Sequence, residues 1–190
     1  MLSYGWSGVD QLASSSNLPW LVPGIGIALV VSVAASGRVA RWLGVTRVAA
    51  WVLLMSTGVI LSATLTPQAL EARGDPGLGR LCELTRIGPP GLAELSSSPV
   101  VEGNILMFIP LGFAIAVAPR SSHKRALLVG AFALPFLIEA TQFVVTPLGR
   151  GCQSADVTDN LTGLVLGLAL GALTARLAPR LVRKSTNHSP

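Results

Sequence analysis

Charged residues are scarce in this chain of 190 residues: only 12% are Asp, Glu, Lys or Arg, whereas 51% are hydrophobic. Soluble domains carry roughly 25% charged residues, so the shortage argues against a water-soluble fold. Histidine and cysteine are also rare, at two residues each. Two cysteines without a nearby histidine make a poor zinc site. We therefore expect no metal and no cofactor.

The sequence contains several long runs of apolar residues. A run of 18 or more nearly uncharged residues predicts a membrane helix, because at 1.5 Å per residue it crosses a hydrocarbon core of roughly 30 Å. The sequence predicts an all-α membrane protein, a bundle of five transmembrane helices. The first run has no basic segment before it, so we expect a retained helix rather than a cleaved signal peptide. The five runs cover about residues 18–36, 48–66, 100–118, 126–146 and 160–178.

The basic residues give the predicted orientation. Ten of the 14 lie in the loops 37–47 and 119–125 and at the C-terminal end, where no acidic residue is found. Short basic loops stay cytoplasmic, so the N-terminus is expected outside and the C-terminus inside. Anionic lipid is the natural partner of such loops, and nucleic-acid binding is not expected without a separate basic domain. The expected parts are an outer segment (1–17), two scaffold helices (18–66), an extracytoplasmic loop (67–99), a three-helix core (100–178) and a basic tail (179–190).

Glu139 is the most informative residue because it lies inside the fourth apolar run, with Gln142 on the same helix face. A carboxylate there costs of order 2.5–3.5 kcal/mol if it faces lipid as an ion. A partner such as Arg150, protonation or a bound substrate must offset that cost. The predicted topology brings a set of candidate binding residues to the outer third of the bilayer: Asn104, Glu139, Gln142, Arg150, Asp156, Asp159 and Asn160.

Each candidate also has a structural explanation. Asp156 and Asp159 suit the N-terminus of a helix, where carboxylates cap backbone N–H groups. Asn104 and Gln142 suit hydrogen bonds between helices. For Glu139, the structural explanation is an ion pair with Arg150.

Cysteines and glycines suggest how the helices are tied together. Cys82 and Cys152 both fall on the predicted outer side, where disulfides persist, so we expect a bond that pins the long loop over the turn between the last two helices. Two free thiols are the alternative. The loop itself is read either as a lid over the outer helix ends or as a solvated tether.

A face of small residues lets helix backbones approach closely, either within the chain or in a homodimer; here it comprises Gly163, Gly167 and Gly171.

Several motifs follow one another in a distinctive order: Asn104-x-x-x-Phe108-x-Pro110-x-Gly112, then Glu139-x-x-Gln142, then Arg150, Asp156, Asn160 and Gly163. This pattern resembles the VanZ-like family of small bacterial membrane proteins, which is named for a protein associated with teicoplanin resistance. The resemblance covers about residues 100–175. It implies a multi-pass protein of the bacterial cell membrane with a role in the envelope, and it does not name a reaction.

Three functions are compatible with these observations. The first is binding of a polar lipid, a lipid-linked cell-wall precursor or a glycopeptide, with a contribution to envelope function or lipoglycopeptide resistance; Arg150 would hold an anionic group, and Glu139 with Gln142 would orient donors. The second is an intramembrane hydrolase or transferase in which Glu139 and Asp156 divide the acid and base roles. The sequence contains no GxSxG or HExxH motif and no serine–histidine pair on the outer side, so no known catalytic motif supports this second function. The third is a structural subunit of a membrane complex.

Overall fold

The computed structural model describes residues 20–67, 82–119 and 122–186. Within these residues, five helices are long and apolar enough to cross a membrane, which confirms the predicted all-α bundle. The outer segment 1–17, residues 68–81 of the 67–99 loop and the end of the basic tail lie outside the described residues. The five helices are α2 (Leu21–Leu43), α3 (Arg47–Thr64), α5 (Pro99–Val117), α6 (Ser122–Val144) and α7 (Ser154–Thr186).

Helix α2 continues to Leu43, beyond the end predicted near residue 36. It stops at Gly44, whose φ of 68° is a left-handed conformation that glycine adopts without steric cost. Helix α3 begins almost at once, where the hydroxyl of Thr46 accepts a hydrogen bond from the backbone N–H of Ala49 at 3.2 Å. Arg41 and Arg47 therefore lie at helix ends rather than in a separate loop. Long arginine side chains allow this because their charged heads reach water while the backbone stays helical.

Helix α7 begins at Ser154, ahead of the start predicted near residue 160. Asp156, Asp159 and Asn160 therefore occupy its first two turns. The sequence prediction stopped at these residues because ions are unfavourable in an apolar run. In the structure, both aspartates have hydrogen-bonding partners within the protein, so the helix continues through them.

Helices α5 and α7 form the most extensive contact in the bundle, and α2 with α3 the next. The glycines of α7 face α5: a Cβ added at Gly163 would collide with the carbonyl of Ile105, and one at Gly167 with the carbonyl of Ile109. The glycine face thus packs within the chain, as the first of the two alternatives predicted. Phe108 and Leu164 are fully buried at this interface and belong to the hydrophobic core.

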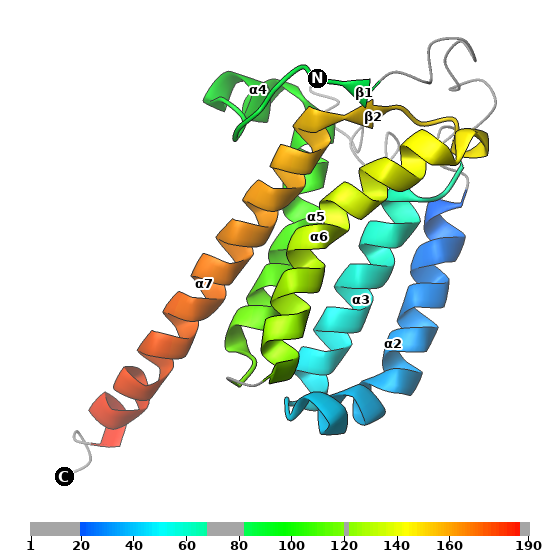
Figure 1. Ribbon diagram of the computed structural model, residues 1–190. Helices are drawn as coiled ribbons and strands as arrows, with labels where there is room; N and C mark the ends of the chain where they lie inside the picture. Colours follow the sequence, from blue (N-terminus) through cyan, green and yellow to red (C-terminus); the bar gives the residue numbers. More distant parts are fainter. Residues whose placement is uncertain (1–19, 68–81, 120–121, 187–190) are drawn as a thin grey trace, which may run out of the picture.

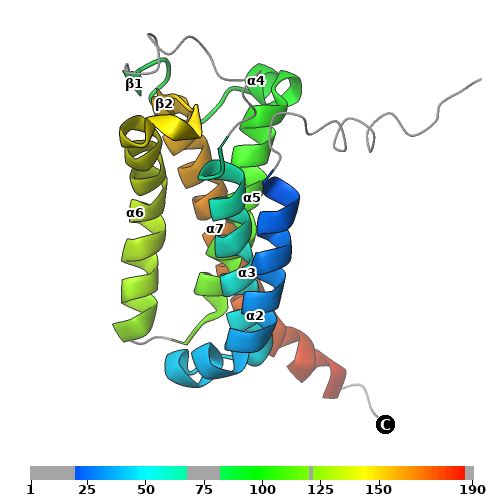
Figure 2. The same ribbon diagram turned by 90° about the vertical axis from the view of Figure 1, so that its right-hand side faces the viewer.

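One end of the bundle carries a small cap. The strand β1 (Cys82–Glu83) pairs in parallel with β2 (Cys152–Gln153), and the short helix α4 (Leu92–Ser97) follows β1. The predicted disulfide between Cys82 and Cys152 is present and joins the two strands. Both strands lie beside the first turn of α7 (Figures 1 and 2). We call residues 82–88 together with β2 the roof, and this end of the bundle the carboxylate end; the opposite end, with Arg41 and Arg47, is the basic end.

Candidate functional site

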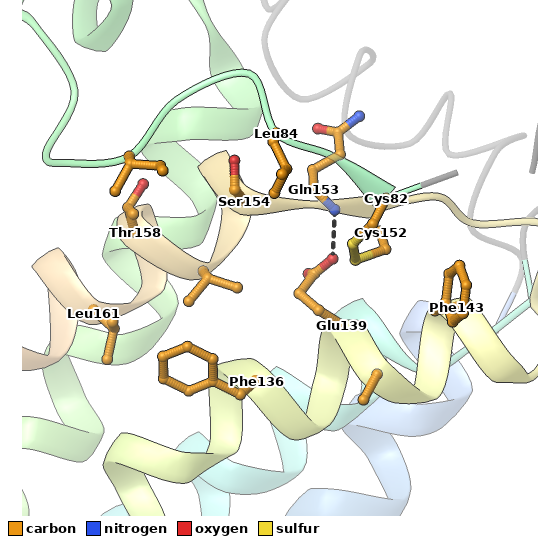
Figure 3. A pocket seen from close by; sticks show the side chains of 13 residues that line it. Cys82, Leu84, Phe136, Glu139, Phe143, Cys152, Gln153, Ser154, Thr158 and Leu161 are labelled. Carbon is orange, nitrogen blue, oxygen red and sulfur yellow. Dashed lines mark hydrogen bonds between the residues drawn. A yellow bond between two sulfur atoms is a disulfide. The ribbon is translucent and has the colours of Figure 1, made fainter. Parts of the chain in front are cut away.

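Glu139 is buried on α6, with 4% of its surface exposed. Its Oε2 accepts a hydrogen bond of 2.8 Å from the backbone N–H of Gln153 in β2, as Figure 3 shows. Among the described residues, no basic side chain lies within ion-pair distance of this carboxylate. The partner of Glu139 is therefore the roof and not Arg150, the partner considered from the sequence.

Arg150 is directed to the end of α3 instead. Its Nη2 donates to the carbonyl of Ala63 at 2.6 Å and its Nε to the carbonyl of Thr66 at 3.2 Å. The last carbonyls of a helix lack partners within the helix, so the guanidinium caps α3. Burial lowers the pKa of Arg150, and the nearby charge of Asp156 raises it. Arginine nevertheless stays protonated in proteins, so this residue acts as a fixed cation.

Gln142 has the same target. Its Nε2 donates to the carbonyl of Thr64 at 2.8 Å, also at the end of α3. Gln142 and Arg150 together attach the C-terminal part of α6 and the chain that follows it to α3. The structure therefore brings these two predicted site residues together in a helix cap.

Two predicted residues join α5 to α7. The side-chain amide of Asn104 donates to Asp156 at 2.9 Å. Asn160, one turn further along α7, is 1% exposed, and its Oδ1 is buried without a hydrogen-bond partner among the described residues. The hydrogen bond between Asn104 and Asp156 therefore joins α5 to α7 on the side of the glycines nearer the carboxylate end.

Arg86 is a site residue that sequence reasoning missed. Its Nη2 donates to both carboxylate oxygens of Asp159, at 2.7 and 2.8 Å, and Asp159 is only 1% exposed. Its Nε also lies 3.5 Å from Glu94 in α4. The pair fastens the roof to α7. One signal was present in the sequence: Arg86 is a basic residue on the side that the charge bias assigns to the outside.

A cavity of about 640 Å³ lies between α6 and α7, beneath the roof. Its walls are apolar, and the polar groups come from Glu139, Gln153, Ser154 and Thr158 (Figure 3). Of the predicted binding residues, Glu139 alone lines it. The full lining consists of Cys82, Leu84, Ile87, Phe136, Glu139, Ala140, Phe143, Cys152, Gln153, Ser154, Val157, Thr158 and Leu161.

This lining determines what the cavity can accept. The apolar walls suit a hydrocarbon chain, and one buried carboxylate suits a hydroxyl or an ammonium group. The described lining contains no basic side chain, so it offers no counter-charge to an anion. It also lacks Asp156, whose partner Asn104 lies on α5. A single carboxylate in the lining favours binding over a division of acid and base roles between two carboxylates.

Comparison with known proteins places this arrangement in a family. Residues 83–175 match the sequence model of the VanZ/LLP1 family. The match begins in β1, upstream of the resemblance seen from residue 100, and so includes the roof and the cavity lining except Cys82, together with the first two-thirds of α7. No curated protein and no solved structure matches the chain. With five helices of membrane-spanning length and this match, the chain is a VanZ-like family protein.

Proposed function

We propose that this protein binds an amphipathic lipid in the cavity between α6 and α7 and thereby serves the cell envelope. The ligand's hydrocarbon chain lies against Phe136, Val157 and Leu161, and a headgroup hydroxyl or ammonium donates to Glu139. The observation that carries the proposal is a carboxylate, 4% exposed, set in the wall of an otherwise apolar cavity. A volume of about 640 Å³ is within the usual range of ligand pockets.

The depth of the site supports a lipid ligand. Glu139 lies about one turn from the end of α6 at Val144, near one surface of a membrane-spanning bundle. The charge bias predicts that surface to be extracytoplasmic. A lipid or a lipid-linked wall precursor has a headgroup at this depth and a chain below it. A glycopeptide, which is large and polar, is a poorer match to apolar walls, so any contribution to lipoglycopeptide resistance follows from handling of the lipid.

A cavity-filling substitution tests the proposal. Ala140 is exposed and lines the cavity, whereas Ala126 is exposed on the same helix and does not. We expect Ala140→Trp to reduce the lipid that co-purifies with the protein in mild detergent by at least tenfold, measured by mass spectrometry of the extract. Ala126→Trp should retain it. Equal retention in the two variants would refute the cavity as the binding site.

Two further variants separate recognition from stability. Glu139→Gln keeps the side-chain shape but removes the charge, so it should weaken binding of an amine-bearing lipid more than that of its N-acylated derivative. Arg150→Met should lower thermal stability without changing lipid preference, because Arg150 caps α3 and does not line the cavity. Recovery of cleaved rather than intact lipid after long incubation would favour the hydrolase alternative.

A further inference from the structure

A second hollow lies at the basic end of the bundle, between α2 and α3. It has a volume of about 300 Å³ and is lined by Val33, Ser36, Arg47, Val48 and Trp51. The Nε of Arg47 donates to the hydroxyl of Ser36 at 3.3 Å, and Ser36 is only 1% exposed. A buried hydroxyl therefore orients an exposed arginine at the mouth of this hollow.

The charge around Arg47 is complementary to an anion. Arg38 and Arg41 lie on the last turns of α2, and α2 and α3 carry no carboxylate. Arg47 is the first residue of α3, where the helix dipole also favours negative charge. Among the described residues, no ion pair ties Arg47 to a carboxylate. The planar fork of arginine matches the oxygens of a phosphate group.

An apolar groove adjoins this hollow at Trp51, which lines both. The groove has a volume of about 510 Å³ and runs between α3 and α5. From Arg47 to Val59 the helix rises roughly 18 Å at 1.5 Å per residue. This is close to half of a hydrocarbon core of about 30 Å, the depth of one leaflet. Besides Trp51, the groove is lined by Val52, Met55, Ser56, Val59, Leu106, Met107 and Pro110.

We propose that these two hollows form one binding site for an anionic glycerophospholipid of the leaflet at the basic end. The phosphate contacts Arg47 above Ser36, Trp51 lies where headgroup meets hydrocarbon, and one acyl chain occupies the groove between α3 and α5. The site is independent of the cavity beside Glu139, which lies at the other end of the bundle. Inorganic phosphate shares the headgroup chemistry but cannot fill the groove.

Lipid binding to the full chain in nanodiscs tests the headgroup half of this site. We expect tighter retention of phosphatidylglycerol than of phosphatidylcholine, measured by native mass spectrometry. Arg47→Gln should lower phosphatidylglycerol retention at least fivefold, and Arg47→Lys should lower it less. Arg38→Gln is the matched control, since it removes the same charge nearby but does not line the hollow. Equal losses for Arg47→Gln and Arg38→Gln would show diffuse attraction and overturn the proposal.

A variant in the groove proposed for the acyl chain tests the site even if Arg47→Gln perturbs the fold. Val59→Trp fills the groove, and Val30→Trp places the same bulk on an exposed face of α2. We expect Val59→Trp to reduce retention of phosphatidylglycerol at least fivefold while Val30→Trp does not. Displacement of the bound lipid by millimolar inorganic phosphate would identify an adventitious anion site and overturn the lipid assignment. Resistance to such displacement would support it.

Discussion

The two faces of α7 differ sharply in how they meet their neighbours. Toward α5, Gly163 and Gly167 bring the two backbones so close that a single added methyl group would collide with a carbonyl. Toward α6, Val157, Thr158 and Leu161 line an open cavity. Small residues thus decide where the helices touch and larger ones border the space that remains. That space is closed at the carboxylate end by the roof, so the cavity depends on a few specific contacts rather than on helix packing.

The largest expected effect comes from removing the roof's ionic anchor. Arg86→Met leaves the carboxylate of Asp159 buried without its partner, which typically costs about 3–5 kcal/mol. Thermal unfolding in detergent micelles should show a clear loss of stability, and the folded fraction should retain less lipid. Arg125→Met, at an exposed residue of α6, is the control.

A double variant checks the cause of that loss. Arg86→Met combined with Asp159→Leu removes both charges, so much of the stability should return if the unpaired carboxylate is responsible. A loss below about 1 kcal/mol for the single variant would mean that the roof is held in another way.

The next effect tests the α5 face of α7. Gly163→Ala inserts a methyl group against the carbonyl of Ile105 and should cost about 1–3 kcal/mol. Gly130→Ala is its control, because nothing lies within 4 Å of a Cβ added there. Removing a glycine from a helix interior should make that control as stable as the parent or slightly more so. If both variants melt alike, the close approach of α5 and α7 is not what holds them together.

The smallest effect concerns the polar contact above the glycines. Asn104→Leu removes the hydrogen bond to Asp156, and because Asp156 is only half-buried we expect a loss of about 1 kcal/mol. Glu102→Gln, an exposed position on the same helix, should change stability by less than about 0.5 kcal/mol. Chemical unfolding of the two variants in parallel measures the difference. If Asn104→Leu is as stable as the parent protein, the stability of the α5–α7 interface comes from the glycine packing alone.

The sequence was sufficient to predict the spans and the disulfide and to single out Glu139 as a site candidate, because each follows from a local property: apolar length, cysteine location or a carboxylate in an apolar run. It could not reveal the partner of Arg150, since the exposed carbonyls at the end of α3 leave no residue pattern. The pairing of Arg86 with Asp159 spans 73 positions and has no local signature either. The cavity depends on how far α6 diverges from α7, which packing determines and sequence spacing does not encode.

The attachment of α6 has a mechanical consequence. At one end, Lys124 donates to the carbonyl of Ala116 in the last turn of α5 and to that of Ala118 just after the helix. At the other end, Gln142 donates to the carbonyl of Thr64 at the end of α3. Between them lies Pro135, whose missing N–H softens a helix at its middle. Helix α6 is therefore held at both ends, and the backbone hydrogen bond missing at Pro135 lies between them. If the proposed lipid enters between α6 and α7, we expect α6 to bend outward at Pro135, which would break neither the disulfide nor the contacts at the helix ends.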